Sequence, residues 1–431
     1  MTVVLDRPYE FVPRYRGNTW PTLIQTFRLI DWHLRRRECV VDYELRHESR
    51  LADSLAAGHG ILLAPNHCRY ADPIALGWLA RHVDTHLYAM ASWHLFNTNA
   101  FERFALRRMG AFSILREAND RQSIDTAIEV LSTAERPLVL FPEGTTNRTN
   151  DLLKPLLEGV TFIARAAARK RHKATGGKVV LHPVGIKYVC VGDARPWINQ
   201  QLTDLETALQ FHRRPNSVQP ANGSECDPID TDAASVLRRL GRVAEAFLAI
   251  KEVDYAGASS SGSLPPRRDA LIEFLLSGAE ANCQITVDDG QSGQSVRERV
   301  RRIRTAAHAR YFDAPDPSES LRWRCQSDAR QADLAQWLLS FPDEYLQPDT
   351  VTDTQVVETI QRIQEAVYGK ARDTMPLKVI IDVDDPITVP SQRQRRDKAA
   401  SADQRDPLLC QLDEKLHTIV GRLAGEAQRF V

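Results

Sequence analysis

The first half of the chain alternates short apolar runs with amphipathic segments, and this rhythm narrows the possible folds more than any other feature. The apolar runs occupy 61–64, 87–90, 112–115 and 138–141. Periodic segments, in which apolar residues return every three or four positions, follow them at 72–82, 94–108, 124–131 and 153–170. Runs this short suit buried strands, and the longer periodic segments suit helices. The alternation predicts an α/β layer with helices packed on a mostly parallel sheet.

The rhythm changes toward the middle of the chain. Two apolar runs at 179–181 and 184–186, separated by His182-Pro183, predict two further strands. Residues 195–228 are rich in Asn, Gln and Pro, which predicts an irregular segment. Helical patterns then follow at 236–250, 266–280, 294–312, 320–341 and 352–372. We therefore expect a large helical region in the second half of the chain.

A strand pattern returns late, in the sequence LKVIIDVDDPITV at 377–389, and an amphipathic pattern at 408–423 follows it. A single strand cannot satisfy its own backbone hydrogen-bonding groups. This strand must therefore join a sheet, and the first half of the chain supplies one. The predicted fold is α/β, with a mostly parallel central sheet flanked by helices and a large all-helical insertion before the closing strand and helix.

The predicted domain boundaries follow from this arrangement. Residues 1–50 form an N-terminal segment, 51–195 the α/β core, 196–375 the helical insertion, and 376–431 the closing strand and helix. Two basic runs, at 299–304 and 393–398, are interpreted as solvated surfaces or loops, with a lipid-facing patch as the less favoured alternative.

The N-terminal segment contains a helical pattern at 20–37 whose apolar face is rich in aromatic residues. This face is formed by Trp20, Leu23, Ile24, Phe27, Ile30 and Leu34. Arg35, Arg36 and Arg37 close the pattern. Such a face with terminal arginines suits a helix that lies on an anionic bilayer. It equally suits a helix docked on the protein core, with its arginines at the negative end of the helix dipole.

Charge and cysteine content limit the partners and the compartment. The 56 Lys and Arg residues balance the 56 Asp and Glu residues, so the chain has no overall field to attract nucleic acid. Seven scattered cysteines without a C-x-x-C pair disfavour a disulfide framework or a zinc site and favour a reducing compartment. There is no signal-peptide pattern and no apolar run of the roughly 20 residues that span a bilayer. We expect a cytoplasmic protein, peripheral on the inner face of a membrane.

Polar residues follow the first buried run. His67 comes directly after the turn Pro65-Asn66, and Asp72 opens the next helical pattern. A histidine and a carboxylate in these positions can form a general base and the group that orients it. Taken alone, the pattern favours a turn histidine beside a helix-capping aspartate.

Two more polar clusters end predicted strands of the same layer. Arg116 follows the run at 112–115, and Phe141-Pro-Glu-Gly-Thr-Thr146 follows the next strand. In open α/β sheets, ligands bind outside the carboxyl ends of the strands, so His67, Arg116 and Glu143 are expected to converge there. Taken singly, each cluster has a structural interpretation, because a terminal arginine is usually a surface charge and Pro-Glu-Gly-Thr is usually a tight turn.

Together and in this order, the clusters resemble the motifs of the glycerolipid acyltransferase family, which makes phosphatidic acid from acyl thioesters and glycerol phosphates. Residues 67–72 match its His-x4-Asp motif, 110–116 its second block, 141–145 its Phe-Pro-Glu-Gly-Thr block, and Pro183 its fourth. The resemblance covers about 50–190 and 377–431, where the late strand is similar to the family's closing strand. It implies an O-acyltransferase of the 1-acylglycerol-3-phosphate or glycerol-3-phosphate type.

The sequence departs from the family pattern at Thr146. Many members carry an arginine at this position, directly after Glu-Gly-Thr, which grasps the phosphate of the acceptor. Threonine offers a hydrogen bond but neither a charge nor a bidentate fork. Either Arg148 or another basic group replaces that arginine, or the acceptor differs.

The resemblance also implies roles for individual residues. His67 would remove the proton of the acceptor hydroxyl, an effect typically worth roughly 10²–10⁴-fold, and Asp72 would fix the tautomer of His67. The residues implied to bind the acceptor are Arg116, Glu143, Gly144, Thr145, Thr146 and Arg148. The chain contains no G-x-S-x-G elbow, which disfavours a covalent serine intermediate. Cys68 adjoins the base and is expected to point away from it.

The expected partners are an acyl thioester donor, carried by CoA or by acyl-carrier protein, and a glycerophosphate or lysophospholipid acceptor at a membrane surface. No cofactor and no metal are expected, because H-E-x-x-H, clustered Cys and His, and a P-loop are absent from the sequence. Two alternatives remain open. One is a CoA-independent transacylase between phospholipids. The other is a non-catalytic lipid-binding module, against which the presence of both His67 and Asp72 argues.

Overall fold

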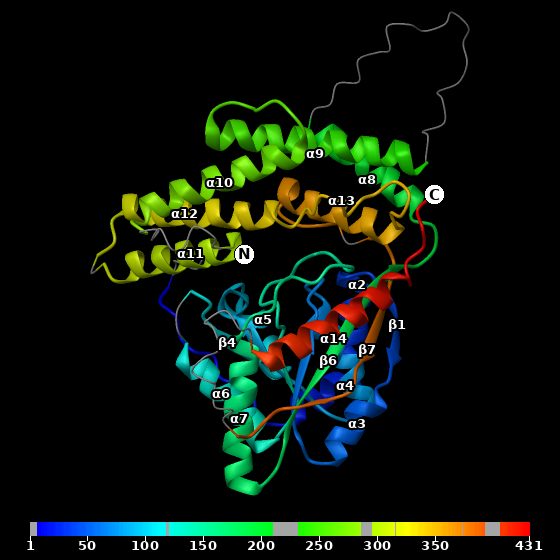
Figure 1. Ribbon diagram of the computed structural model, residues 1–431, viewed down its shortest axis with the longest axis vertical. Coiled ribbons are helices and arrows are strands. Elements are labelled where there is room, and N and C mark those ends of the chain that lie inside the picture. Colours follow the sequence, from blue (N-terminus) through cyan, green and yellow to red (C-terminus); the bar gives the residue numbers. More distant parts are fainter. Residues whose placement is uncertain are drawn as a thin grey trace, which may run out of the picture. The chain divides into compact units, whose positions relative to one another are not determined.

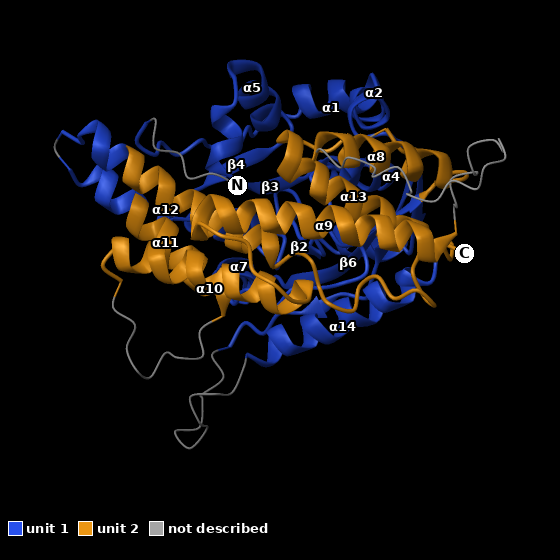
Figure 2. Cartoon of the chain, turned by 90° about the horizontal axis from the view of Figure 1, so that it is seen from above, with its two compact units in different colours: residues 1–189, 308–322, 377–426 blue, residues 190–307, 323–376, 427–431 orange. Residues whose placement is uncertain are grey.

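The computed structural model describes residues 7–117, 120–209, 232–285, 295–314, 316–372, 374–392 and 406–431. The chain divides into two compact units, coloured separately in Figure 2. The first unit takes its residues from 1–189, 308–322 and 377–426, and the second from 190–307, 323–376 and 427–431. Three separate stretches of the chain thus build the first unit.

A sheet forms the centre of the first unit (Figure 1), and it has eight strands among the residues that the structure describes. Its strands are β1 (Val40–Arg46), β2 (Gly60–Pro65), β3 (Tyr88–Ser92), β4 (Ala111–Ile114), β5 (Leu138–Val139), β6 (Val179–Cys190), β7 (Leu377–Val383) and β8 (Ile387–Thr388). The order across the sheet is β1-β7-β6-β2-β5-β3-β4, and β8 pairs with β6 off this path. β2 pairs parallel with β5 and β6, and β3 pairs parallel with β4 and β5. The prediction of a mostly parallel sheet is confirmed.

The late strand joins this sheet, as the sequence predicts, but in the reverse direction to its neighbour β6. β7 pairs parallel with β1. Near one end of β7 the Asp384 N–H donates to the carbonyl of Pro183, and near the other the Val191 N–H donates to the carbonyl of Pro376. This pattern makes β7 and β6 antiparallel. The predicted strand at 377–389 is also interrupted, and its end returns as β8, which pairs antiparallel with β6.

Two features of the sheet differ from the sequence prediction. β6 runs unbroken through His182 and Pro183, where the sequence predicts two strands. Proline lacks an N–H, but Pro183 keeps its register opposite Ala64, and its carbonyl still accepts the Asp384 N–H, so the strand continues. β1 is absent from the prediction, because its sequence VVDYELR contains no sustained apolar run.

Helices flank the sheet within the first unit. They are α1 (Thr19–Thr26), α2 (Leu29–Arg37), α3 (Ser49–Ala56), α4 (Asp72–His82), the 3₁₀ helix η1 (Trp93–Asn97), α5 (Ala100–Arg108), α6 (Arg121–Thr133), α7 (Gly159–Thr175) and α14 (Pro407–Ala424). A buried cluster joining strands and helices includes Leu62, Leu131, Leu138, Ala164 and Leu412. α14 lies directly on β6, because a side-chain carbon at Gly185 would come within 2.1 Å of Ile419 Cγ2.

The single helix predicted at 20–37 is instead two helices, α1 and α2. Between them, Arg28 adopts a left-handed backbone conformation, with φ of 50° and ψ of 39°, which ends one helix before the next begins. The break divides the predicted apolar face. On that face Leu34 is buried in the protein while Phe27 is exposed. Trp32, which lies off the predicted face, is exposed as well.

The second unit is helical, as predicted for this part of the chain. Its helices are α8 (Arg195–Ala208), α9 (Ala233–Ala256), α10 (Leu264–Asn282), α11 (Val296–Phe312), α12 (Glu319–Leu338) and α13 (Asp353–Tyr368), with the end of α11 and the start of α12 assigned to the first unit. The prediction of an irregular segment at 195–228 is wrong over α8, where Pro196 occupies the first turn and favours helix initiation. The rest of that segment, 210–228, lies outside the described residues.

The basic run at 299–304 is not simply solvated. Arg299 pairs with Glu280, and Arg304 pairs with Asp333, so two of its arginines tie helices together. The second basic run, at 393–398, lies outside the described residues. Among the residues that the structure describes, no helix combines the length and the apolar character needed to cross a bilayer.

Candidate active site

The candidate site begins where β2 leaves the sheet. β2 lies between β5 and β6, and its last residue, Pro65, is followed by Asn66 and His67. The Asn66 side chain donates to the Ile186 carbonyl at 3.0 Å and accepts the Ile186 N–H at 2.7 Å. This two-way bond to β6 fixes the direction in which the chain leaves β2 and therefore the position of His67.

His67 and Asp72 form a hydrogen-bonded pair. The distance between His67 Nδ1 and Asp72 Oδ2 is 2.8 Å, and the Asp72 side chain is fully buried. An ionised carboxylate can only accept, so in the neutral imidazole Nδ1 carries the hydrogen and Nε2 keeps its lone pair. Asp72 is not the cap of α4, because Ala71 holds that position and no side chain caps the helix. The Asp72 carboxylate therefore hydrogen-bonds to the histidine and does not cap the helix.

Asp72 is held by further donors that sequence reasoning missed. The Tyr188 hydroxyl donates to Asp72 Oδ1 at 2.9 Å, and the Arg69 N–H donates to Oδ2 at 2.9 Å. Burial, and then the neighbouring carboxylate of Asp72, raise the pKa of Tyr188 well above its usual value, so the phenol keeps its proton. No motif marks Tyr188. Its role depends on β6 continuing past Pro183, which the sequence does not predict.

The loop after β5 is bound to His67 on both sides of its peptide. Glu143 Oε1 accepts the His67 N–H at 2.7 Å, and the Asn147 N–H donates to the His67 carbonyl at 2.8 Å. The other Glu143 oxygen accepts from Asn147 Nδ2 and from the Lys154 N–H. Burial raises the pKa of Glu143, and these hydrogen bonds oppose that rise. Glu143 is fully buried, so its carboxylate positions the base and its loop.

This clamp brings Thr146 onto the reactive side of the histidine. Thr146 Oγ1 lies 3.1 Å from His67 Nε2. Because Nε2 carries the lone pair, the threonine hydroxyl donates to it. The Phe141 ring stacks on the imidazole, with centroids 3.9 Å apart and planes 24° apart, and so fixes the ring orientation. Tyr188, Asp72, His67 and Thr146 thus form one continuous chain of hydrogen bonds.

The other predicted site residues are Gly144, Thr145, Arg148 and Arg116. Gly144 has a φ of 68°, which makes the turn after β5. Thr145 is half-buried beside it. The Arg148 guanidinium lies 4.8 Å from the centroid of the Tyr70 ring. Arg116 follows β4, the edge strand three positions from β2 in the sheet.

Cys68 lies behind the base. Its Sγ is 3.7 Å from Asp72 Oδ1 and 3.6 Å from the Ile186 carbonyl oxygen, and the residue is buried. It therefore faces the carboxylate, whereas the reactive nitrogen of His67 faces Thr146. In the described part of the chain, no group of three or more His, Cys, Asp or Glu residues is arranged to hold a metal ion.

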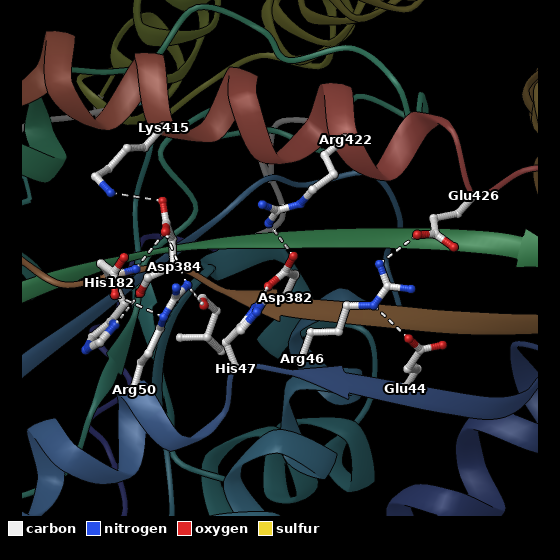
Figure 3. A network of polar contacts seen from close by, with 12 residues as sticks. Glu44, Arg46, His47, Arg50, His182, Asp382, Asp384, Lys415, Arg422 and Glu426 are labelled. Carbon is white, nitrogen blue, oxygen red and sulfur yellow. Dashed lines mark hydrogen bonds and ion pairs between the residues drawn. The ribbon is translucent and has the colours of Figure 1, made fainter.

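A second histidine–aspartate pair occurs elsewhere in the same unit (Figure 3). His47 Nδ1 lies 2.8 Å from Asp382 Oδ1, just after β1 and within β7. The other oxygen of Asp382 accepts from the Arg422 guanidinium of α14 at 2.5 Å. The surrounding charged network contains Glu44, Arg46, Arg50, Asp384, Lys415 and Glu426. This network ties α14 to β1 and β7.

The comparisons with known proteins bear on the first of these pairs. A family model described as Acyltransferase matches residues 46–187. A search of curated proteins finds no match for the chain. The matched segment includes β2, β5, most of β6, the start of α4 with Asp72, and the loops that carry His67 and Thr146. Residues 46–187 are therefore similar to the Acyltransferase family.

Proposed function

We propose that this protein moves a fatty acyl group from an acyl thioester to the hydroxyl of a glycerophosphate or a lysophospholipid. One observation carries the proposal. His67 is held by Asp72 with Nδ1 protonated, and its Nε2 lone pair already faces a hydroxyl group, that of Thr146, at 3.1 Å. An alcohol in that place would be ready to lose its proton. We name His67 the general base and Asp72 the group that orients it.

The chemistry requires a proton acceptor that regains neutrality in each cycle. As the acceptor oxygen forms its bond to the acyl carbon, its proton passes to His67 Nε2. Asp72 stabilises the imidazolium that results. When the carbon–sulfur bond breaks, the imidazolium returns the proton to the leaving thiolate. No cofactor is needed in this sequence, because the thioester supplies the activated acyl group.

The acceptor's phosphate would be bound by cations near the strand ends. We assign this role to Arg116, as the resemblance implies, and to Arg148, which follows the Glu-Gly-Thr block closely in the sequence. Arg148 lies against Tyr70, whose side chain is half exposed. Gly144 and Thr145 would line the approach to the base. Glu143 would act indirectly, because both of its oxygens accept hydrogen bonds from the protein.

The membrane part of the proposal rests on exposed apolar side chains of α1, α2 and α5. Their exposed fractions include 68% for Phe27, 60% for Trp32 and 77% for Phe101. Phe104 of α5 contacts Trp20 of α1 edge to face, with centroids 5.1 Å apart, so the two helices share one surface. Arg35, Arg36 and Arg37 are exposed at the end of α2. Aromatic side chains beside arginines suit the surface of an anionic bilayer.

A vesicle assay tests this surface. The double variant Phe27→Ser, Trp32→Ser should lose most of its co-sedimentation with phosphatidylserine-containing vesicles, because it removes two exposed aromatic side chains that would enter the bilayer surface. Phe274→Ser, which removes an exposed phenylalanine of α10 in the second unit, is the matched control and should bind as the wild type does. Equal binding by all three proteins would contradict the assignment.

A turnover screen tests the reaction. Purified protein is given acyl-CoA with glycerol 3-phosphate, lysophosphatidate or lysophospholipids, and His67→Ala serves as the inactive counterpart. Product from the wild type alone supports the proposal. Product formed from a phospholipid donor without any thioester would favour the transacylase alternative. Binding of lysophosphatidate without turnover from any donor would favour the lipid-binding module.

A further inference from the structure

We propose that Arg108 binds the phosphate group of a bilayer lipid, in a site walled by aromatic rings. The rings belong to Tyr15, in the segment before α1, to Trp20 of α1 and to Phe104 of α5. The inference rests on the proposed membrane surface of α1, α2 and α5. It adds to that surface one specific binding site for a lipid headgroup.

The rings surround the charge of Arg108. Its guanidinium carbon lies 4.3 Å from the centroid of the Tyr15 ring. The same carbon lies 5.0 Å from the centroid of Phe104 and 5.7 Å from that of Trp20. All these distances fall within the roughly 6 Å over which an aromatic face attracts a cation. Because Phe104 also meets Trp20 edge to face, the rings of α1 and α5 form one enclosure beside the charge.

The Tyr15 ring, the nearest to the charge, is held in place by the segment before α1. A side-chain carbon at Gly17 would overlap the Tyr15 hydroxyl, so the glycine lets the ring fold back over its own chain. Arg107 donates from Nε to the Pro13 carbonyl at 3.1 Å, which fastens the same segment to α5. The ring is therefore positioned over Arg108 by contacts of the backbone.

The charge of Arg108 differs from that of two other arginines that lie over a ring in this unit. Arg14 and Arg136 both lie over the Tyr88 ring, and both are buried. Arg14 pairs with Glu129 at 3.3 Å, and Arg136 donates to two backbone carbonyls. Arg108 is partly exposed, and no residue in the described part of the chain accepts a hydrogen bond from it or forms an ion pair with it. Its donors are available to an anion from outside the protein.

The shape of the site favours phosphate. A guanidinium carries five N–H donors in one plane, and this fork matches two oxygens of a phosphate group. Aromatic rings contact the faces of a guanidinium and leave the plane of its donors to the anion. The rings also exclude water from one side of the charge, which strengthens its attraction to an anion.

The surroundings of the site favour a lipid as the source of that phosphate. Trp20 and Phe104 are themselves exposed, and Phe101 is exposed on the same helix as Arg108. Aromatic side chains of this kind lie at the level of the headgroups when a protein contacts a bilayer. A lipid phosphate thus gains both the cation and the apolar contact of the rings with the bilayer, whereas a soluble phosphate ion gains the cation alone.

The test compares two substitutions that keep the net charge. The full-length wild type, Arg108→Lys and Arg36→Lys are sedimented with phosphatidylcholine vesicles that contain phosphatidate, and the dissociation constants are measured. Lysine lacks the planar fork, so Arg108→Lys should weaken binding by roughly fivefold or more. Arg36 is an exposed arginine at the end of α2, and Arg36→Lys should bind within about twofold of the wild type.

A further variant tests the aromatic wall. Tyr15→Leu keeps an apolar side chain and removes the nearest ring, so it should weaken binding by roughly two- to fivefold. Circular dichroism and the urea midpoint of each variant confirm that it is folded. Wild-type affinity in Tyr15→Leu would contradict the part that we assign to the ring.

The outcomes separate this site from the proposed membrane surface. Wild-type binding by Arg108→Lys, together with lost binding by the Phe27→Ser, Trp32→Ser variant, would overturn the site and leave the surface standing. Equal losses in Arg108→Lys and Arg36→Lys would also overturn it, because a diffuse basic surface would explain them. Displacement of the wild type from vesicles by inorganic phosphate at constant ionic strength would assign the site to soluble phosphate. A wild type that binds no vesicles would overturn both surface and site, and the turnover screen would still test the reaction.

Discussion

The first unit contains two histidine–aspartate pairs with the same 2.8 Å separation, and their surroundings are opposite. In the first pair, Asp72 Oδ1 accepts a hydrogen bond from the neutral hydroxyl of Tyr188, and the His67 side chain is 10% exposed. In the second, Asp382 shares its charge with the Arg422 guanidinium, and the His47 side chain is 50% exposed.

The difference shows what makes such a pair a base. A carboxylate bound to an arginine has part of its charge already compensated, so it stabilises an imidazolium less. A carboxylate whose hydrogen-bond donors are neutral has an uncompensated negative charge, so it stabilises the imidazolium more strongly. The first pair also has a hydroxyl at Nε2, whereas the second pair joins a network that fastens α14 to the sheet. We expect the first pair to govern activity and the second to govern stability.

The largest contrast should come from the histidines. His67→Ala should lower kcat for acyl transfer by about 10²–10⁴-fold, because the general base is lost. His47→Ala, the matched change in the second pair, should keep kcat within about twofold, since no substrate-facing group depends on it. Initial rates with acyl-CoA measure both. A large loss in His47→Ala would mean that the two pairs are not separate in function.

The second contrast concerns the unfolding free energy. Asp382→Asn should destabilise the protein by about 1–3 kcal/mol, because the carboxylate is buried and the amide cannot accept from both His47 and Arg422. The urea midpoint should fall, while kcat under native conditions stays at the wild-type value. A wild-type midpoint would show that the network adds no net stability.

A smaller effect should follow from removal of the neutral donor. Tyr188→Phe keeps the buried ring and deletes the hydrogen bond to Asp72, which is worth about 1 kcal/mol, so kcat should fall by roughly fivefold. Tyr88→Phe is the control, since it deletes a hydroxyl that lies on another strand, β3, and donates to Glu135. Equal rates for the two variants would mean that the Tyr188 hydroxyl has no part in orienting the base.

The smallest expected effect is the pH dependence of stability that comes from His182, which lies near the second pair. Burial lowers the pKa of His182 below its ordinary value of 6.5, so the folded protein binds this proton less readily than the unfolded chain does. Stability should therefore fall as the pH drops below 6.5 toward the lowered pKa, and rise again with pH. His182→Gln should flatten the dependence of the urea midpoint on pH in that window. An unchanged slope would assign the pH dependence to other groups.

Much of the fold could be predicted from the sequence, because local patterns determine it. The pattern of apolar residues predicts β2, α4 and the late strand. The late strand must join the sheet, because its backbone N–H and C=O groups need hydrogen-bond partners. β1 could not be found this way, since its side chains are mostly half-buried or exposed. The break between α1 and α2 at Arg28 could not be predicted either, because arginine rarely adopts the left-handed conformation.

The candidate site was predictable only in part. The motifs identified His67, Asp72 and the loop at 141–146, since each follows a predicted strand. Spacing could not show that Glu143 turns its carboxylate to the backbone of His67, nor that Thr146 faces Nε2. The role of Tyr188 could not be predicted from the sequence, because its contact with Asp72 depends on a strand that continues through a proline.

The place of β1 has a consequence for biosynthesis. β1 is an edge strand, and its neighbour in the described sheet is β7, about 330 residues further along the chain. At a translation rate of about 5–20 residues per second, β1 waits roughly 17–66 s for the partner that completes its hydrogen bonds. Once β6 has been synthesised, the nascent sheet exposes it at an open edge until β7 follows. A ribosome-bound chain stopped before 377 should therefore be a strong client for chaperones that recognise unpaired strands, and one stopped after α14 should not.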